Sequence, residues 1–95
     1  MAAIDVYESP APDGWRFTLT VSEGASRTQH KVTLSNTAYE RLSGGKVPPE
    51  ALVREAFAFL LAREPKEAIL PEFDLTVIGR YFPEFEAALN KQLPR

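Results

Sequence analysis

The 95-residue chain contains no cysteine and only one histidine. The absence of cysteine excludes disulfide bonds, thiolate catalysis and cysteine-ligated zinc or iron–sulfur clusters. No apolar run approaches the roughly eighteen residues of a membrane-spanning helix, and the first residues lack the basic and apolar regions of a secretory signal. We therefore expect a cytoplasmic protein with no membrane segment, no metal and no cofactor.

The composition is that of a chain that buries a core. Hydrophobic residues make up 44% of the sequence and charged residues 25%, which is ordinary for a globular protein. A length of 95 residues leaves room for one core, so residues 1–95 are predicted to form a single domain. The formal net charge of −2 argues against attraction of the whole molecule to nucleic acid and leaves only local patches for such a role.

Residues 15–34 carry the clearest pattern, that of one β-hairpin. From Trp15 to Ser22 apolar and polar residues alternate, which is the two-residue period of a half-buried strand. A turn at Gly24-Ala25, with glycine supplying the positive φ, directs the apolar residues of both arms to one face. A slip of one residue would expose one arm's apolar set, so the pattern selects one register. The predicted pairs are Trp15 with Leu34, Phe17 with Val32, Leu19 with His30, and Val21 with Thr28.

Ahead of the hairpin, residues 3–8 alternate in the same way and predict a first strand. The linker from Ser9 to Gly14 contains two prolines and an Asp-Gly pair, which predicts a turn that returns the chain. The expected sheet is a three-stranded antiparallel meander, with strands at about 3–8, 15–22 and 27–34.

After Leu34 the signals change from strands to helices. Thr37 and Glu40 have the spacing of a capping box, and Ser43-Gly44-Gly45 is typical of a helix end. Prolines at 65 and 83 mark further boundaries, and Asp74 is placed to cap a helix. Four or five helices are predicted to follow the meander and pack against it, at about 37–43, 49–64, 66–70, 74–82 and 83–92. The predicted fold class is therefore α+β.

The helix at 50–64 is expected to be the central one. Its apolar residues cover well over half of its circumference, and Trp15 and Phe17 are predicted to lie against them. The remaining face is lightly charged and partly made of small residues: Ala51, Arg54, Glu55, Ala58 and Ala62. This face could accept a partner protein or a second copy of the chain; the alternative is that later helices of the same chain cover it.

Four short segments between about residues 32 and 86 carry a resemblance to known proteins. They are Phe59-Leu60-Leu61, Arg63-Glu64-Pro65-Lys66-Glu67, Phe73-Asp74-Leu75 and Tyr81-Phe82-Pro83-Glu84. In these segments the chain resembles a group of small bacterial proteins whose activity is uncharacterised. Most of these residues pack, cap or end helices, so the resemblance implies a common fold and transfers no active site.

Three groups of residues have side chains or spacings that suggest chemistry. His30 is a natural choice for acid–base catalysis, but no catalytic partner is near it in the sequence, and the hairpin register puts it at the edge of the apolar face. Ser43-Gly44-Gly45-Lys46 is similar to the end of a phosphate-binding loop, but Pro48-Pro49 removes two amide donors. A third group is acidic and lacks the spacing of a calcium loop. It consists of Glu64, Glu67, Glu72 and Asp74.

The polar face of the hairpin is locally basic. No carboxylate lies among its residues, while the aromatic Trp15 and Phe17 point to the opposite side. A sheet that binds single-stranded nucleic acid usually carries aromatic side chains on its binding face. An ordinary solvated face is therefore the simpler interpretation, and contact with an anionic partner is the alternative. The residues of this basic face are Arg16, Arg27, Gln29 and Lys31, with Thr18, Thr20 and Thr33 beside them.

These observations lead to two hypotheses of function. The first is a non-enzymatic protein-interaction or regulatory module, which needs only a surface and includes self-association as a homodimer. The second is a nucleic-acid-binding, antitoxin-like regulator that uses the basic face of the hairpin. No catalytic residue is assigned, because the lone histidine has no partner and no nucleophile motif is present.

Overall fold

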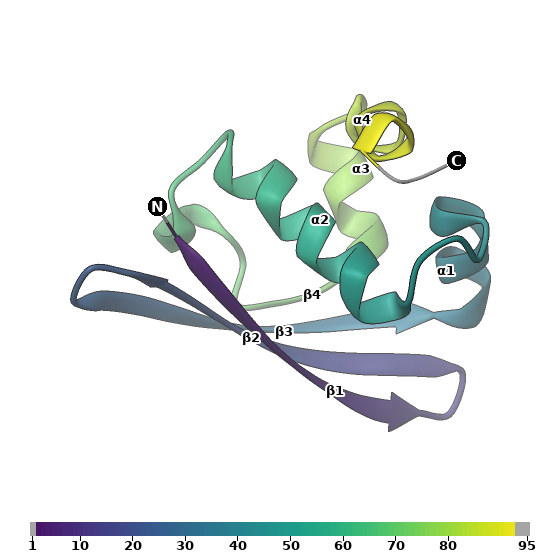
Figure 1. Cartoon of the computed structure of the whole chain (residues 1–95), viewed down its shortest axis with the longest axis horizontal. Helices are drawn as coiled ribbons and strands as arrows, with labels where there is room; N and C mark the ends of the chain where they lie inside the picture. The colour runs from purple at the N-terminus through teal and green to yellow at the C-terminus, as the bar shows by residue number, and fades with distance from the viewer. Residues whose placement is uncertain (1, 93–95) are drawn as a thin grey trace.

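A computed structural model describes residues 2–92, which form a four-stranded sheet with helices on one of its faces (Figure 1). The strand order is β1-β2-β3-β4. The strands are β1 (Ala3–Ala11), β2 (Gly14–Glu23), β3 (Ser26–Ser35) and β4 (Glu72–Asp74). The α-helices are α1 (Asn36–Ser43), α2 (Pro49–Leu61), α3 (Ile78–Tyr81) and α4 (Phe85–Gln92), and the 3₁₀ turns are η1 (Lys66–Ala68) and η2 (Leu75–Val77).

The hairpin of β2 and β3 has the predicted register. Trp15 lies opposite Leu34, Phe17 opposite Val32, and the remaining predicted pairs also match. The turn is Gly24-Ala25, in which Gly24 has a φ of 59° while Ala25 does not have a positive φ. A positive φ at the first turn position alone is what a type II′ turn requires. The apolar–polar alternation therefore specified the pairing, and Gly24 specified the turn.

The β1–β2 connection is tighter than predicted. β1 continues through Pro10 to Ala11, which lies opposite Gly14, so only Pro12 and Asp13 form the turn. The prolines did not end the strand early, because β1 is an edge strand and an edge strand tolerates a residue that has no amide donor. A side chain at Gly14 would meet the Leu34 carbonyl oxygen at 2.0 Å. This glycine therefore permits a close approach of the β2 and β3 backbones.

The predicted count of three strands is wrong, because β4 adds a fourth and makes the sheet mixed. β4 pairs in parallel with β3, so that Lys31 lies beside Glu72 and Val32 beside Phe73. Lys31 N donates a 2.8 Å hydrogen bond to the Pro71 carbonyl oxygen at the start of this pairing. The chain reaches β4 only after crossing the sheet through α1, α2 and η1.

The helices begin and end close to the predicted positions, with five differences. The N-cap of α1 is Ser35, whose hydroxyl accepts from Ala38 N at 3.1 Å, and not Thr37. α2 ends at Leu61 rather than at 64, and the predicted turn of helix at 66–70 ends at Ala68. The segment predicted as one helix at 74–82 divides into η2 and α3, and the last helix begins at Phe85.

The core lies between the sheet and α2. Phe17, Leu19 and Val32 from the sheet are at most 1% exposed, as are Leu52 and Phe57 from α2. Trp15 was expected against α2, but it is half-buried and its ring lies 5.2 Å from that of Tyr39 in α1. Trp15 therefore packs at the end of the core rather than in its centre.

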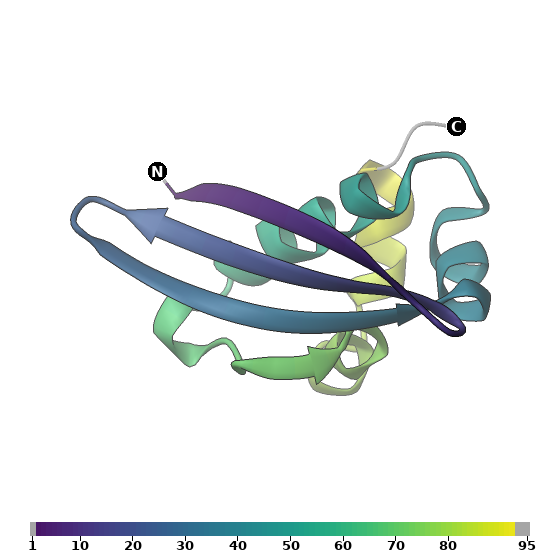
Figure 2. The ribbon, with the colours of Figure 1, turned by 90° about the horizontal axis from the view of Figure 1, so that it is seen from below.

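The second face of the sheet carries no helix within residues 2–92, as the view from below shows (Figure 2). Polar residues from each of the four strands lie on it, at the positions that alternate with the core residues. Among the described residues, no helix is both long and apolar enough to span a lipid bilayer.

Candidate functional site: a cleft between α2 and β4

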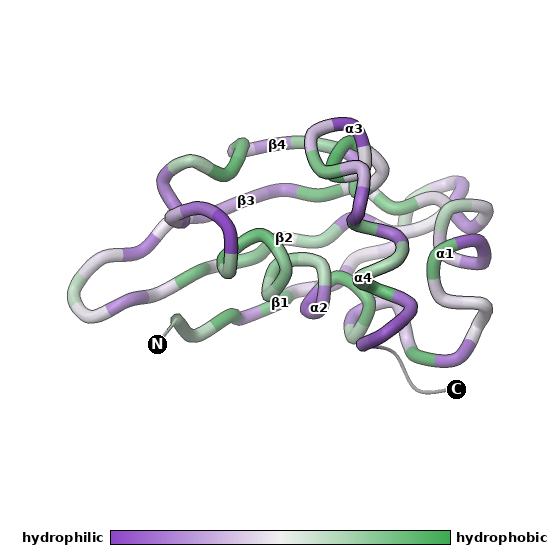
Figure 3. Tube along the Cα trace, turned by 90° about the horizontal axis from the view of Figure 1, so that it is seen from above, coloured by the Kyte–Doolittle hydropathy of each residue, from purple (hydrophilic) through white to green (hydrophobic). Residues whose placement is uncertain are grey.

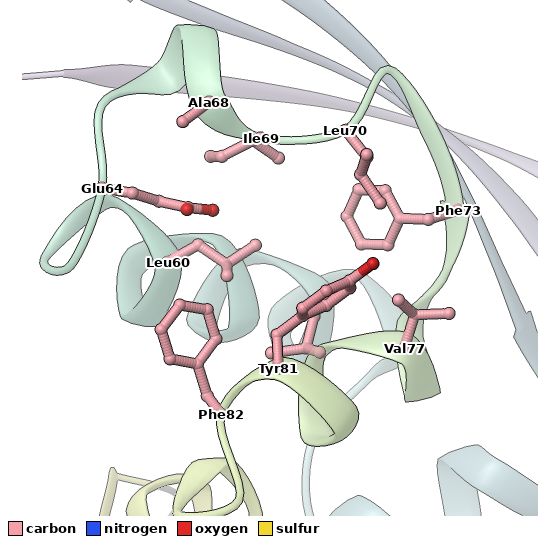
Figure 4. A pocket seen from close by; sticks show the side chains of 10 residues that line it. Leu60, Glu64, Ala68, Ile69, Leu70, Phe73, Val77, Tyr81 and Phe82 are labelled. Atoms are coloured by element: carbon pink, nitrogen blue, oxygen red, sulfur yellow. The ribbon is translucent and has the colours of Figure 1, made fainter.

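A cleft of about 360 Å³ opens beside β4, and its walls are mostly apolar (Figure 4). One wall is the C-terminal end of α2, a second is the segment of η1 that leads to β4, and a third is α3. The lining residues are Leu60, Glu64, Ala68, Ile69, Leu70, Phe73, Val77, Ile78, Tyr81 and Phe82. The cleft is thus built from the part of the fold that the strand and helix patterns predicted least well.

Two exposed apolar side chains border this cleft. Leu70 is 44% exposed and Tyr81 is 68% exposed, and both line the cleft. The other exposed large hydrophobic residue within 2–92 is Tyr7, which lies on β1 at 70% exposure. Exposed apolar residues that gather at a concave site mark a binding surface more often than isolated ones do. Leu70 and Tyr81 satisfy that condition, whereas Tyr7 lies apart from the cleft.

His30 connects the cleft wall to the hairpin. Its side chain is 2% exposed, and its ring lies 5.5 Å from that of Phe57. Nδ1 is 2.8 Å from the Leu70 carbonyl oxygen; since a carbonyl oxygen only accepts, Nδ1 carries a proton and donates. Nε2 is 2.8 Å from Thr28 Oγ1 and, in the neutral ring, accepts from this hydroxyl. Both nitrogens are therefore hydrogen-bonded, and Nδ1 ties the Leu70 carbonyl to the hairpin.

This arrangement corrects the expected place of His30 at the edge of the apolar face. The predicted pairing with Leu19 is present, but the residue is buried in the core. Figure 3 shows the first half of β3 as a hydrophilic stretch, so hydropathy gives no sign of this burial. The one available signal was the register, which places His30 on the same face as Val32.

Asp74 holds the far end of β4. Its carboxylate accepts from Thr33 Oγ1 at 2.7 Å, from the Thr76 amide at 3.1 Å and from the Thr76 hydroxyl. Partial burial alone would raise the pKa of this carboxyl group, but the hydrogen bonds from the two threonines outweigh burial and hold the pKa below its usual value. The predicted role as a helix cap is confirmed, since Asp74 caps η2.

Lys66 holds the other end of the segment. Its side chain is only 4% exposed, and Nζ lies 2.6 Å from Glu67 and 3.7 Å from Glu23 at the end of β2. The hydrogen bond to Glu67 raises the pKa of Lys66 and lowers the pKa of the Glu67 carboxyl group. Ser26 also donates to Glu67, at 3.4 Å. η1 is thereby tied to the hairpin end.

Glu64 is the only charged residue among the described residues that line the cleft. It is half-buried in the turn after α2, and its carboxylate points into the cleft (Figure 4). Within residues 2–92 no side chain or amide donates a hydrogen bond to this carboxylate. The four acidic residues considered for a calcium loop have separate roles. Asp74 caps η2 and Glu67 pairs with Lys66. Glu72 is exposed on β4, and Glu64 faces the cleft.

The basic face of the hairpin is present but is not purely basic. Arg16, Arg27, Gln29 and Lys31 are exposed, and the register places them on the open face of the sheet. The unpredicted β4 adds Glu72 beside Lys31 and Asp74 beside Thr33 on that same face. Arg16, Arg27 and Lys31 form no ion pair with any described acidic side chain. The face is therefore of mixed charge along β4 and basic along β3.

The candidate protein-contact face of α2 is covered in part by the chain itself. α4 packs beside α2, where the Phe59 and Phe85 rings are 5.1 Å apart. Arg54 donates to the Ile4 carbonyl oxygen at 2.6 Å and pairs with Glu50. Ala58 and Ala62 stay exposed, Ala51 and Glu55 are half-buried, and a smaller hollow of about 250 Å³ lies along Glu55, Ala58 and Ala62. Three of the five predicted residues thus line this hollow, while Ala51 and Arg54 lie outside its lining.

The other sequence candidates have structural roles. Ser43-Gly44-Gly45-Lys46 is the end of α1, where Gly44 has a φ of 62° and donates to the Glu40 carbonyl oxygen at 2.8 Å. Among the described residues no group of three or more His, Asp or Glu side chains could hold a metal ion.

Comparison with known proteins adds no family to this description. A scan against protein-family models, a search of curated proteins and a search of solved structures each found no match.

Proposed function

We propose that this chain is a non-enzymatic binding module and that the cleft beside β4 receives a side chain of a protein partner. The observation that carries this proposal is the position of Leu70 and Tyr81, which expose apolar surface at the border of an apolar cleft. Exposure of apolar surface to water is unfavourable, and a partner's apolar side chain that covers this surface lowers the free energy on binding.

The size of the cleft supports this proposal. A volume of about 360 Å³ lies at the lower end of the range of roughly 300 to 1,000 Å³ for ligand pockets. It suits one long side chain and its neighbouring backbone better than a large cofactor. The cleft also lies next to β4, an edge strand of three residues, where an extended segment of a partner can approach the sheet.

The polar groups of the cleft support binding rather than catalysis. Its lining has two side chains with polar atoms, the Glu64 carboxylate and the Tyr81 hydroxyl. His30 is buried behind the wall with both nitrogens engaged. Acid–base catalysis needs a second titratable group in reach of the first, and among the described residues no hydrogen bond joins Glu64 to the Tyr81 hydroxyl.

The four segments that carry the resemblance to small bacterial proteins also converge on this cleft. Leu60, Glu64, Phe73, Tyr81 and Phe82 each belong to one of these segments, and all five line the cleft. The resemblance itself implies only a common fold and transfers no active site, so the cleft rests on its geometry.

The test compares two tyrosines that are almost equally exposed. Wild-type protein, Tyr81→Ser, Leu70→Ser and Tyr7→Ser are immobilised, and proteins captured from a bacterial extract are quantified by mass spectrometry. The proposal expects at least one protein that wild type and Tyr7→Ser retain and that Tyr81→Ser and Leu70→Ser lose, because only the latter two change the cleft. If no captured protein follows this pattern, the proposal is wrong.

The second candidate is the nucleic-acid-binding, antitoxin-like regulator. Arg16, Arg27 and Lys31 favour it, since these cations are exposed and form no ion pair with described residues. The carboxylates of Glu72 and Asp74 on the same face disfavour it, because they repel a phosphate backbone. We therefore rank this function second.

A further inference from the structure

Among the described residues, the Glu64 carboxylate is the one charge that lines this mostly apolar cleft. It points toward the space enclosed by Leu60, Ile69 and Tyr81 (Figure 4). A half-buried carboxylate that has lost part of its hydration favours a nearby positive charge more strongly than a fully exposed one does. The lining supplies no such charge.

The cations that are nearest to Glu64 in the sequence are occupied elsewhere. Arg63 lies over the Phe59 ring at 3.6 Å and pairs with Glu84 at 3.6 Å, on the side of the α2–α4 hollow. Lys66 is buried between Glu67 and Glu23. Neither side chain lines the cleft, so neither neutralises Glu64.

The end of α2 adds to the negative character of the cleft. α2 ends at Leu61, its last turn contains no basic residue, and Leu60 of that turn lines the cleft. The C-terminal end of a helix carries a partial negative charge from its aligned peptide dipoles. Arg63 donates to the Phe59 carbonyl oxygen at 3.1 Å and offsets part of this charge, so Glu64 is the main negative group at the cleft.

We propose that the partner side chain that enters the cleft is a lysine or an arginine, with its aliphatic stem against the apolar walls and its cationic end at Glu64. This inference rests on the proposed function. Lysine and arginine bury their methylene groups while the charged end keeps a polar contact. The faces of Tyr81 and Phe82 add a weaker attraction for a cation in the same cleft. A purely aliphatic partner would leave Glu64 desolvated without compensation.

The probe is a set of capped hexapeptides that are identical except at one central position, which is lysine, norleucine or glutamate. Norleucine has the four-carbon stem of lysine without the ammonium group. Dissociation constants are measured by NMR titration of the full chain at low salt. We expect the lysine peptide to bind about fivefold more tightly than the norleucine peptide, the effect of one partly exposed ion pair, and the glutamate peptide to bind most weakly. The lysine preference should shrink as salt is added.

The variants separate the local effect of Glu64 from general electrostatics. Glu64→Gln should bring the ratio of lysine to norleucine affinity close to one. Glu72→Gln is the matched control, because it removes a carboxylate eight residues away on β4 that does not line the cleft. It should leave the ratio near its wild-type value. An unchanged ratio in Glu64→Gln, or an equal loss in Glu72→Gln, overturns the inference.

The same titrations distinguish failure of this inference from failure of the proposed function. Suppose that the norleucine peptide binds, that Tyr81→Ser abolishes its binding, and that the lysine peptide binds no more tightly. The cleft is then a binding site, but the proposal of a cationic side chain is wrong. If no peptide shows binding that depends on Tyr81, both proposals fail. Free n-hexylammonium that binds as tightly as the lysine peptide overturns the assignment of a protein segment as the partner.

Discussion

The β2–β3 hairpin and the segment from η1 to α3 are held in place by different means. The hairpin is a continuous ladder of ten paired residues on each strand, with its apolar face buried under α2. The segment from η1 to α3 contains only short elements of three or four residues. It depends on a few side chains for its position: His30 at Leu70, Asp74 between two threonines, and Lys66 with two glutamates.

The difference explains why the candidate site lies where it does. The apolar face of the long hairpin is covered by α2. The short elements from η1 to α3 pack less completely against α2, and the cleft lies between them. Loops and short elements on a rigid scaffold commonly carry binding residues. The hairpin and α2 are the scaffold here, and the segment from η1 to α3 supplies most of the lining.

The largest expected effect concerns the scaffold. Phe17→Ala should lower the free energy of unfolding by about 3 to 5 kcal/mol, because it leaves a cavity under α2 at a side chain that is 1% exposed. Chemical denaturation monitored by circular dichroism measures the loss. Trp15→Ala should cost less than Phe17→Ala, since Trp15 is only half-buried. Thr18→Ala on the open face is the control, and a loss as large as that of Phe17→Ala would contradict the facing of β2.

A smaller effect is expected where the two regions meet. His30→Leu keeps an apolar side chain in the core but removes the donor to the Leu70 carbonyl oxygen. It should cost about 1 to 3 kcal/mol, the range for leaving one buried polar group unsatisfied. Hydrogen exchange should increase at amides of residues 66–74 more than in β2. Gln29→Leu, at the adjacent exposed position, should not produce this regional increase. If both variants accelerate hydrogen exchange equally in residues 66–74 and in β2, His30 does not position the cleft wall.

The contribution of Asp74 to the free energy of unfolding should depend on pH. Its folded-state pKa lies below the usual value of 3.8, so the stabilisation is complete above that value and is lost as the pH falls through the folded pKa. Asp74→Asn should therefore be less stable than wild type at neutral pH, and the difference should shrink below about pH 4. Denaturation series from pH 7 to pH 2 measure it, with Glu72→Gln as the control on the same strand. A difference that grows toward acid would contradict the assigned hydrogen bonds.

The same contrast shows what a single sequence can predict. The β2–β3 hairpin was predicted in full register because its signals are local: an alternation of period two on each arm and a glycine between them. α2 was predicted because its apolar residues and flanking prolines lie within one stretch. Only its last turn was misplaced, since the chain leaves the helix before Pro65 rather than at it.

The cleft was not predicted, because its determinants are far apart in the sequence. β4 has three residues and depends on pairing with a strand about forty positions earlier; no local pattern specifies so short a strand. The partner of His30 is a backbone carbonyl, which carries no sequence signature. Leu70 and Tyr81 read as ordinary apolar residues, and only the fold places them together at the border of a cavity.

The smallest expected effect concerns the basic face, which belongs to neither the core nor the cleft. Changing Arg16, Arg27 and Lys31 together to glutamine should alter the free energy of unfolding by less than about 0.5 kcal/mol per residue. These side chains are exposed and form no ion pair with a described residue. It should also leave peptide binding at the cleft unchanged.

Electrophoretic mobility of single- and double-stranded oligonucleotides at low salt decides whether this face has a role of its own. We expect wild type not to retard them, because Glu72 and Asp74 lie beside the cations and the open face lacks a second exposed aromatic side chain to stack with Tyr7 on a base. Retardation by wild type that the triple variant abolishes would reverse the ranking of the two functions. Retardation that survives the triple variant would place nucleic-acid binding on another surface, since the loss of three phosphate contacts lowers affinity steeply at low salt.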